Sequence, residues 1–286
     1  MLVAVIGDKG LLGKDLTSLL LSKGDKVVGF SRSNLDLSIS SDELADEISQ
    51  ADVIINAVAY TQVDAAEDHK DEARLVNGVY AGKLAQVAKT LRAKFIQIST
   101  DYVFPGDSSV PIATNDPTSP SNEYGASKLL GEQLVAESGA DYQIFRTAWL
   151  YGAGGNCFPK AIAKRLLESG HVEVVNDQIG QPTWSKDLAH VIYSHIHNPF
   201  NERIVHAVSS GSTSWFGFAE AIASSVPGLP AFTIQPISSL YLENRVVRPA
   251  FSALDNTGTS GPIIGNWLDR WKVAAPEILS SIQEFK

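Results

Sequence analysis

An apolar run followed by three evenly spaced glycines determines the architecture of this chain: Leu2-Val3-Ala4-Val5-Ile6-Gly7-Asp8-Lys9-Gly10-Leu11-Leu12-Gly13. Its continuous apolar run predicts a strand buried on both faces of a parallel sheet. The periodicity of Leu11–Ser22 predicts a helix, and the glycines between strand and helix are spaced G-x-x-G-x-x-G. Such a turn can be purely structural, but before a helix N-terminus it favours a pyrophosphate. We therefore predict that a dinucleotide binds at Gly7, Gly10, Leu11, Leu12 and Gly13.

The alternation of strand and helix continues through the first half of the chain. Short runs rich in Val and Ile alternate with segments long enough for crossover helices, which is typical of an α/β, Rossmann-type doubly wound parallel sheet. The predicted strands are Leu2–Ile6, Lys26–Phe30, Val53–Asn56, Lys94–Ser99 and Asp141–Arg146. Besides the first helix, helical periodicity is clearest over Asp71–Leu91.

After Arg146 the alternation of strands and helices becomes less regular, and glycine, proline and serine become frequent. We predict helices near Pro159–Ser169 and Lys186–His197 and a short strand at Glu173–Val175. Residues 1–147 are the expected dinucleotide-binding domain, and residues 148–286 are expected to form a smaller, more irregular unit. Elements near residues 172–200 are expected to return to the first sheet.

Composition excludes several classes of protein. The 286 residues carry a net charge of −9, whereas nucleic acids and anionic membrane surfaces call for a basic face. No uninterrupted apolar run reaches about 18 residues, and the first residues lack the charged start of a signal peptide. The single cysteine, Cys157, cannot form an internal disulfide, which fits a reducing compartment. We therefore expect a cytoplasmic globular protein.

Cofactor choice is decided at the end of the second strand, where an acid would bind the adenosine ribose of NADH and an arginine the 2′-phosphate of NADPH. The chain reads Phe30-Ser31-Arg32 there, without an acid. Arg32 therefore favours NADPH, although a solvent-exposed arginine would look the same and NADH stays an alternative. Asp36 and Leu37 are expected at the adenine edge, or in a turn before the next helix.

A reducing site is indicated by Tyr124 and Lys128, which share one helix face at i and i+4. A tyrosine with its ordinary pKa of about 10 is a weak acid near neutrality, and a nearby cation lowers that pKa. Thr100 ends the fourth strand, at the edge where such sheets present their ligand contacts. Its hydroxyl is suited to donate to a carbonyl oxygen that is becoming an alkoxide, or else to cap a turn.

These motifs and several longer blocks resemble the dTDP-4-dehydrorhamnose reductase family of the extended short-chain dehydrogenase/reductase superfamily. The blocks run in family order to about residue 190 and comprise Asn56–Glu67, Ser99–Phe104, Tyr124–Lys128 with Gly131-Glu132, Arg146–Gly152 and Asp177–Thr183. The resemblance implies a Rossmann-type domain whose segments interleave with the smaller substrate domain.

The resemblance also implies roles for single residues. Thr100, Tyr124 and Lys128 match the family's catalytic triad. The positions that line its nicotinamide ribose, together with Tyr124 and Lys128, are Ala57, Ala59 and Tyr60. The positions around its sugar nucleotide, together with Thr100, are Thr61, Val63, Asp101, Tyr102 and Trp149. For the diphosphate we expect Arg248, and less strongly Lys160, although both can be ordinary surface residues.

The implied reaction is NADPH-dependent reduction of the 4-keto group of a dTDP-4-keto-6-deoxy sugar, taking dTDP-4-dehydro-L-rhamnose to dTDP-L-rhamnose. The C-terminal part departs from the family, because Phe251 stands where an asparagine usually follows Arg248-Pro249-Ala250. The aromatic and acidic residues usual after Pro111 are Ile112 and Thr114. These changes fall on the substrate side and leave the sugar nucleotide open.

Other functions are compatible with parts of the pattern. A 4,6-dehydratase usually carries Asp-Glu after the threonine, whereas Tyr102 follows Asp101 here. A reductase of another nucleotide-linked keto sugar stays open. The regulatory subunit of methionine adenosyltransferase resembles the same family without being catalytic, but the complete triad favours an enzyme.

Metal binding and assembly are less determined. The six histidines and Cys157 show no ligand spacing, so we predict no metal site from them. Some family members bind Mg²⁺ through carboxylates at a dimer contact, which leaves Mg²⁺ and a homodimer open.

Overall fold

The computed structural model describes residues 1–198, 200–241, 246–259 and 261–282. Six strands form a parallel sheet in the order β10-β5-β4-β3-β1-β2. They are β1 (Leu2–Ile6), β2 (Lys26–Phe30), β3 (Val53–Asn56), β4 (Lys94–Thr100), β5 (Asp141–Thr147) and β10 (Ile204–His206). The predicted parallel α/β sheet is confirmed, and β4 and β5 each run one residue further than predicted. The three-residue β10 was not predicted.

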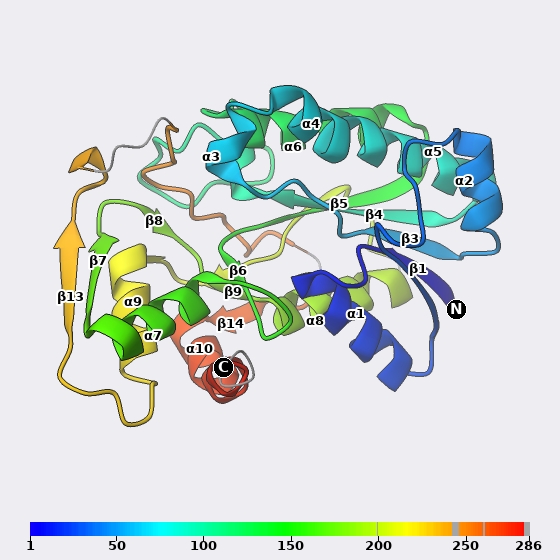
Figure 1. Cartoon of the computed structure of the whole chain (residues 1–286). Coiled ribbons are helices and arrows are strands. Elements are labelled where there is room, and N and C mark those ends of the chain that lie inside the picture. The colour runs from blue at the N-terminus through cyan, green and yellow to red at the C-terminus, as the bar shows by residue number, and fades with distance from the viewer. Residues whose placement is uncertain (199, 242–245, 260, 283–286) are drawn as a thin grey trace.

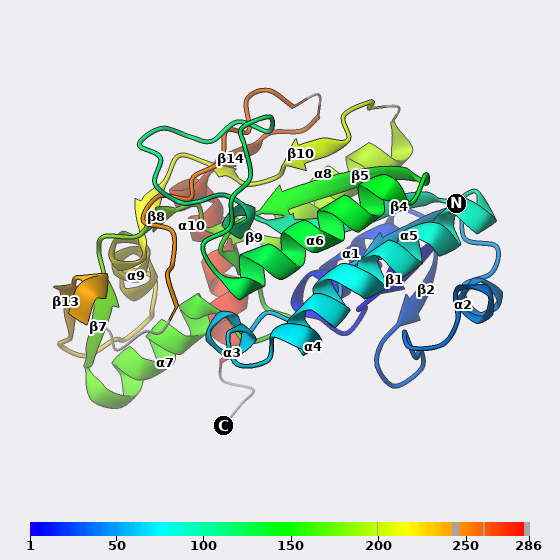
Figure 2. The same cartoon turned by 90° about the horizontal axis from the view of Figure 1, so that it is seen from above.

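Helices cover both faces of this sheet (Figures 1 and 2). On one face lie α2 (Ser41–Glu47), α4 (Lys70–Arg74), α5 (Tyr80–Leu91) and α6 (Glu123–Glu137), and on the other α1 (Leu11–Ser22) and α8 (Ser185–His197). Successive residues of β1 point to opposite faces, so Ala4 and Ile6 join one core and Val3 and Val5 the other. A strand buried on both faces needs apolar residues throughout, as the sequence pattern predicted.

The predicted helix over Asp71–Leu91 is not uniform. The π-helix η1 (Leu75–Val79) lies between α4 and α5. It packs tightly on α6, since a Cβ at Gly131 would lie 2.2 Å from the Asn77 carbonyl oxygen. The wide turn contains Asn77, a fully buried polar residue, and π turns of this kind are frequent at functional sites.

Within the described residues, the smaller part of the molecule is built from short strand pairs and three α-helices. The pairs are β6 (Leu150–Tyr151) with β9 (Thr183–Trp184), β7 (His171–Val175) with β13 (Thr233–Ile237), β8 (Ile179–Gly180) with β12 (Thr213–Ser214), and β11 (Ser209–Ser210) with β14 (Ile264–Asn266). The helices are α7 (Phe158–Ser169), α9 (Trp215–Ala223) and α10 (Trp267–Ser280). They enclose a core of buried aromatic residues that includes Tyr151, Phe218 and Trp271.

The two parts exchange segments. Both α8 and β10 lie beyond residue 147 and join the large sheet, with α8 packed beside α1 and β10 paired with β5. The strand β7, in contrast, pairs with β13 away from it. The predicted helices near Pro159–Ser169 and Lys186–His197 are present as α7 and α8, each beginning one residue earlier.

Three short helical segments complete the described chain: α3 (Val63–Ala66) and the 3-10 helices η2 (Asp101–Val103) and η3 (Ser239–Tyr241). Within the part of the chain that the structure describes, no helix has the length and apolar character needed to cross a bilayer. The order of the large sheet reverses between β1 and β3, and ligands of such sheets bind outside the carboxyl ends of the strands at that point.

Candidate active site

The glycine turn lies at this reversal and is shaped for a close ligand. Gly7 has a φ of +94°, which side chains rarely adopt, and its carbonyl accepts from Gly10 N at 2.9 Å. A Cβ at Gly13 would lie 2.0 Å from the Gly7 oxygen, so only glycine lets α1 start this close to the strand. Leu11 and Leu12 form its first turn, where free N–H groups face outward. The turn therefore fits the pyrophosphate of a dinucleotide.

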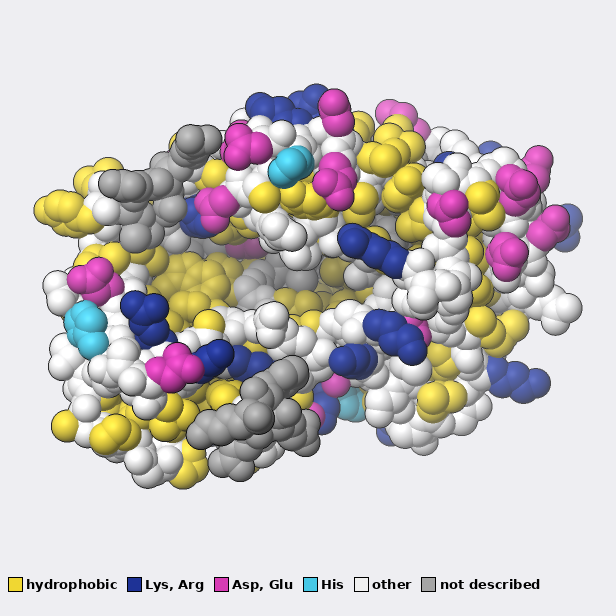
Figure 3. All heavy atoms as spheres, in the orientation of Figure 1, with side chains coloured by type: hydrophobic (Ala, Val, Ile, Leu, Met, Phe, Trp, Pro, Cys, Tyr) yellow, Lys and Arg dark blue, Asp and Glu magenta, His cyan; other side chains and the backbone are white. Residues whose placement is uncertain are grey.

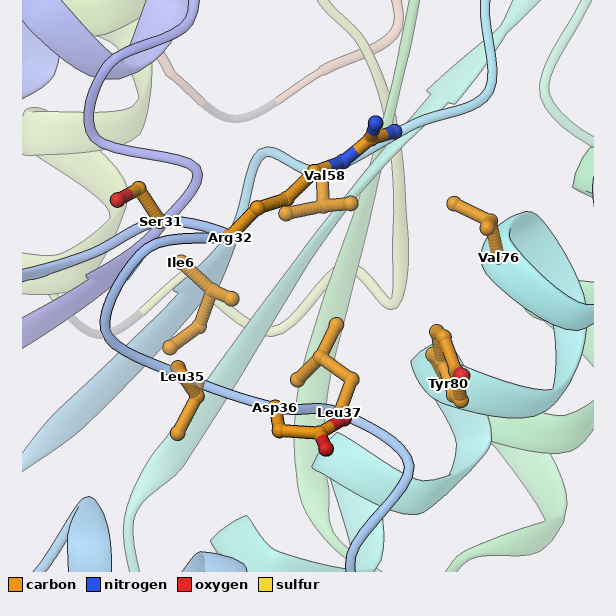
Figure 4. Close-up of a pocket in the computed structure, with 9 residues that line it drawn as sticks. All are labelled: Ile6, Ser31, Arg32, Leu35, Asp36, Leu37, Val58, Val76 and Tyr80. Atoms are coloured by element: carbon orange, nitrogen blue, oxygen red, sulfur yellow. The ribbon is translucent and has the colours of Figure 1, made fainter.

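A cavity of about 360 Å³ opens beside the turn, outside the ends of the first three strands. It contains the three predicted residues of the cofactor's adenosine end, Arg32, Asp36 and Leu37. Figure 4 shows them on the loop after β2, opposite the helical side that carries Val76 and Tyr80. Those two residues were not predicted, because their periodicity resembled that of ordinary core positions.

The segment after β3 closes the next side of the site. The Ala57 backbone touches Gly7, since a Cβ on Gly7 would lie 3.0 Å from the Ala57 carbonyl carbon. Ala59 is half-buried and Tyr60 is buried. Asn77 holds the Tyr60 backbone at both ends, accepting from Tyr60 N at 2.8 Å and donating to Tyr60 O at 3.0 Å.

Asn77 also connects this segment to α6, because its amide donates to Ser127 Oγ at 2.8 Å. Ser127 lies between Tyr124 and Lys128 on that helix. Asn77 was not predicted from the sequence, although an asparagine among apolar helix positions indicates a buried hydrogen-bonding role. Its contacts position the loop after β3 relative to the predicted catalytic helix.

Tyr124 is brought to the end of β4 by the start of α6. Asn122 caps the helix by accepting from Gly125 N at 2.8 Å. A Cβ at Gly125 would lie 2.1 Å from the Tyr102 carbonyl oxygen, so the helix packs directly on the residues after Thr100. The Tyr124 ring meets the Tyr102 ring edge-on, with centroids 5.7 Å apart.

Thr100 lies within this cluster at the last position of β4. Its hydroxyl donates to Asp101 Oδ1 at 2.9 Å and accepts from Tyr102 N at 3.2 Å. Burial raises the pKa of Tyr124 to about 12, while the Thr100 side chain works in the opposite direction. Tyr124 therefore keeps its proton at neutral pH, as a proton donor must.

Lys128 does not lower the pKa of Tyr124 here, contrary to expectation. Its ammonium donates to the Ile98 carbonyl at 2.6 Å, and dehydration of the buried phenol dominates at Tyr124. Burial lowers the pKa of Lys128 to about 8, with Glu132 acting against that shift. Lys128 is 3% exposed, and Tyr124, on the same helix, is half-buried.

A buried ion pair supports the cluster from beneath. Arg146 of β5 binds Glu132 of α6 with two hydrogen bonds, of 2.9 and 2.7 Å, and Glu132 also accepts from Ser99 Oγ at 2.6 Å. The charged side chains are 3% and 6% exposed. They fix α6 against β4 and β5, and with it the helix that carries Tyr124.

A hollow separates two parts of the molecular surface. Figure 3 shows this hollow between the part that carries α3 and α4 and the part that carries α7, with Lys and Arg side chains on its rim. Such a rim suits an anionic ligand despite the net charge of −9. Thr61 is exposed just before α3, and the half-buried Val63 begins it.

Trp149 is held in an unusual conformation. Its φ is +46°, a region that is rare for bulky residues and often found at functional sites. Its ring stacks on Trp215 at 3.5 Å between centroids, and a Cβ at Gly180 would lie 2.4 Å from the indole. Two other segments, those of Trp215 and Gly180, therefore hold this indole in place.

The two diphosphate candidates are both engaged. Arg248 forms an ion pair with Asp64 Oδ2 at 2.6 Å, joining the C-terminal segment to α3. Next to it, Asn122 donates to Val247 O at 2.9 Å. Lys160 is buried and donates to Ala153 O at 2.6 Å, which indicates a structural role.

No group of three or more His, Cys, Asp or Glu side chains within the described ranges is arranged to hold a metal ion.

Known proteins resemble this chain over almost its full length. A model of the RmlD substrate binding domain family matches residues 1–284. The chain belongs to this family. The resemblance inferred from the sequence is thereby confirmed.

Members of the RmlD substrate binding domain family share both sequence and fold with this chain. A dTDP-4-dehydrorhamnose reductase of Burkholderia thailandensis is 40% identical, over 90% of this chain and 91% of its own. A probable dTDP-4,6-dihydroxy-2-methyloxan-3-one 4-ketoreductase of Streptomyces antibioticus is 33% identical, over 97% and 95%. The crystal structure of dTDP-4-dehydrorhamnose reductase from Bacillus anthracis in complex with NADP superposes with a TM-score of 0.90 at 33% identity, over 96% and 99%.

Proposed function

We propose that the chain is an NADPH-dependent reductase of the 4-keto group of a dTDP-4-keto-6-deoxy sugar, converting dTDP-4-dehydro-L-rhamnose to dTDP-L-rhamnose. The observation that carries the proposal is the meeting of Thr100 with Tyr124 and Lys128. Strand β4 and helix α6 bring them together through the close contact at Gly125. The names of the relatives from Burkholderia thailandensis and Bacillus anthracis support the same reaction.

The dinucleotide would lie along the glycine turn, with its adenosine end in the cavity beside Arg32. The turn has space for a pyrophosphate, and the guanidinium offers charged donors for a 2′-phosphate. The NADP complex of the Bacillus anthracis relative supports this choice of cofactor. When bound, NADPH supplies the hydride that reduces the ketone carbon.

The chain's own residues would handle the proton and the oxygen. Tyr124 is protonated at neutral pH and would give its proton to the carbonyl oxygen as the alcohol forms. Thr100 would donate a hydrogen bond to the same oxygen. Lys128 would hold the ribose hydroxyls beside Ala57, Ala59 and Tyr60.

Residues of both parts would enclose the sugar nucleotide. Trp149 and Val63 would offer apolar walls to the deoxysugar, with Thr61, Asp101 and Tyr102 nearby. Arg248 would face the diphosphate after exchanging its contact with Asp64. In this arrangement residues 1–147, with α8 and β10, hold the dinucleotide, and most of residues 148–286 hold the substrate.

The direct test is turnover by the purified chain. With dTDP-4-dehydro-L-rhamnose it should consume NADPH and form dTDP-L-rhamnose in equal amounts. If a dinucleotide binds but no keto sugar is reduced, a non-catalytic regulatory subunit becomes the better account. Co-purification with a methionine adenosyltransferase would then be the deciding observation.

A reductase of a different keto sugar is the second candidate, because Phe251 replaces the family's usual asparagine. Phe251 N donates to Gly106 O at 3.0 Å, and the residue bridges to both Asp107 and Ile179. It therefore lies where the two parts meet. The Streptomyces antibioticus relative carries the name of a reductase of another sugar. A panel of nucleotide-linked 4-keto sugars, ranked by kcat/KM, separates the two candidates.

A further inference from the structure

We propose that Asp101 is a positioning residue that sets the direction of the hydrogen bond made by Thr100. When Asp101 is protonated, the Thr100 hydroxyl is free to donate to the substrate oxygen; when Asp101 is ionised, it takes up that donor. The inference rests on the proposed reduction for its kinetic consequence, but the hydrogen bonding itself can be tested on the free protein.

The geometry places Asp101 behind Thr100. Its side chain is 2% exposed, and its Oδ1 lies 2.9 Å from Thr100 Oγ1. Its second oxygen, Oδ2, is buried and makes no hydrogen bond of ordinary length within the described ranges, although Ser252 lies beside the carboxyl group. A buried carboxylate is costly without donors, so the contacts of Thr100 and Ser252 both bear on its ionisation.

The number of donors and acceptors at Thr100 determines how its contact with Asp101 directs the hydroxyl hydrogen. A hydroxyl has one hydrogen and two acceptor sites, and Tyr102 N already occupies one of these sites. If Asp101 is ionised, it is an acceptor only, so the hydrogen of Thr100 points to it. The remaining site of Thr100 then faces the Tyr124 side chain, and Thr100 cannot donate to a ligand.

Protonation of Asp101 reverses the arrangement. The carboxylic acid becomes a donor to Thr100 Oγ1 across the same 2.9 Å, so both acceptor sites of the hydroxyl are filled. The hydrogen of Thr100 then points to its remaining site, on the side of Tyr124. The proposed reaction puts the carbonyl oxygen on that side, where negative charge develops during reduction.

Both states occur in an accessible pH range. Burial raises the pKa of Asp101 to about 6, although hydrogen bonds from Ser252 and Thr100 act against the shift. The neighbouring phenols keep their protons there, because burial raises the pKa of Tyr102 and that of Tyr124. The other charged groups facing this region are Arg248 and Asp64, which act on Tyr102 and pair with each other.

The kinetic test compares pH profiles. For the wild type, kcat for keto-sugar reduction should fall as pH rises through about 6, by roughly tenfold per unit. Asp101→Asn cannot ionise, so its profile should lack this limb whatever its absolute rate. The matched control is Asp15→Asn, because Asp15 also has a pKa raised by burial and a hydroxyl donor, Ser185 Oγ at 2.5 Å. Its profile should keep the limb. A flat wild-type profile, or a limb that survives in Asp101→Asn, overturns the proposal.

A substrate-independent test uses the carboxyl carbon signal of Asp101 in the free protein, assigned by its loss in Asp101→Asn. Removing the hydroxyl in Thr100→Val should raise the titration midpoint, because the ionised carboxylate loses its donor, whereas Thr100→Ser should retain the wild-type midpoint. An unchanged midpoint in a folded Thr100→Val protein contradicts the coupling. A shifted midpoint without turnover of any keto sugar would instead contradict the proposed function alone.

Discussion

The large sheet and the smaller part of the molecule hold their side chains in different ways. Thr100 ends a strand that pairs with β5 along seven residues, above the buried Arg146–Glu132 pair. Trp149 lies among two-residue strand pairs and is held by a ring stack and by the absence of a side chain at Gly180.

Because they hold their side chains differently, the two parts are suited to different functions. The sheet provides extended backbone pairing and two cores, which hold reacting groups in fixed positions. The smaller part relies on single close contacts, each of which can change without unravelling a sheet. We therefore expect changes in the first part to affect folding and dinucleotide binding, and changes in the second to affect substrate choice.

The largest effect is expected from breaking the buried ion pair with Glu132→Gln. Arg146 would keep its charge in a site that is 3% exposed without a full counter-charge. The free energy of unfolding, measured by denaturant titration, should fall by about 3–5 kcal/mol. Asp141→Asn is the control, because its pair with Arg203 is exposed, and it should cost under about 1 kcal/mol. Similar losses in the two variants would contradict the account.

The next largest effect is expected at the glycine turn, on NADPH affinity. In Gly13→Ala the new methyl group would collide with the Gly7 carbonyl, so α1 must move away from the strand. NADPH affinity should weaken roughly a hundredfold by calorimetry, equivalent to about 2.7 kcal/mol. Gly258→Ala, with no atom within 4 Å of its new Cβ, should bind as the wild type does. Unchanged affinity in Gly13→Ala would remove the turn from the binding site.

A change in the smaller part should act on substrate instead. Gly180→Ala would push the Trp149 indole out of place, because the new Cβ would lie 2.4 Å from it. The KM for the keto sugar should rise roughly tenfold or more, as expected for overpacking of about 1–3 kcal/mol, while NADPH affinity changes less than about twofold. An equal loss of NADPH affinity would show that the two parts do not separate their tasks.

The smallest effect is expected at Arg32, in the cofactor site. Arg32→Ala should weaken NADPH binding roughly tenfold through loss of a charged contact to the 2′-phosphate, and leave NADH binding unchanged. Arg165→Ala, on the exposed side of α7, is the control. If Arg32→Ala lost affinity for NADPH and NADH equally, Arg32 would not contact the 2′-phosphate.

The same difference explains how far the sequence alone predicts the structure. Strands buried on both faces must be apolar throughout, so β1 and β3 were predicted with their observed bounds, as was the apolar edge strand β2. Glycines next to the first strand similarly marked the turn. In the site, Arg32 and Leu37 were predicted at the cavity because they follow the second strand.

The features that the sequence did not predict depend on contacts between distant segments. A three-residue strand such as β10 has no periodicity of its own and forms because β5 offers an edge. The π-helix around Asn77 shares its apolar pattern with an ordinary helix, and its cause lies in Tyr60 and Ser127. The left-handed backbone of Trp149 depends on packing that no local pattern encodes.

In the proposed reaction, Tyr124 donates the proton in an NADPH-dependent reduction of a nucleotide-linked 4-keto sugar. The most direct measurement is kcat for dTDP-4-dehydro-L-rhamnose with wild type and Tyr124→Phe, alongside the NADPH dissociation constant of each. We predict turnover by the wild type, a loss of roughly a hundredfold or more in Tyr124→Phe, and similar NADPH binding. A Tyr124→Phe enzyme that turns over within about threefold of the wild type would contradict the claim.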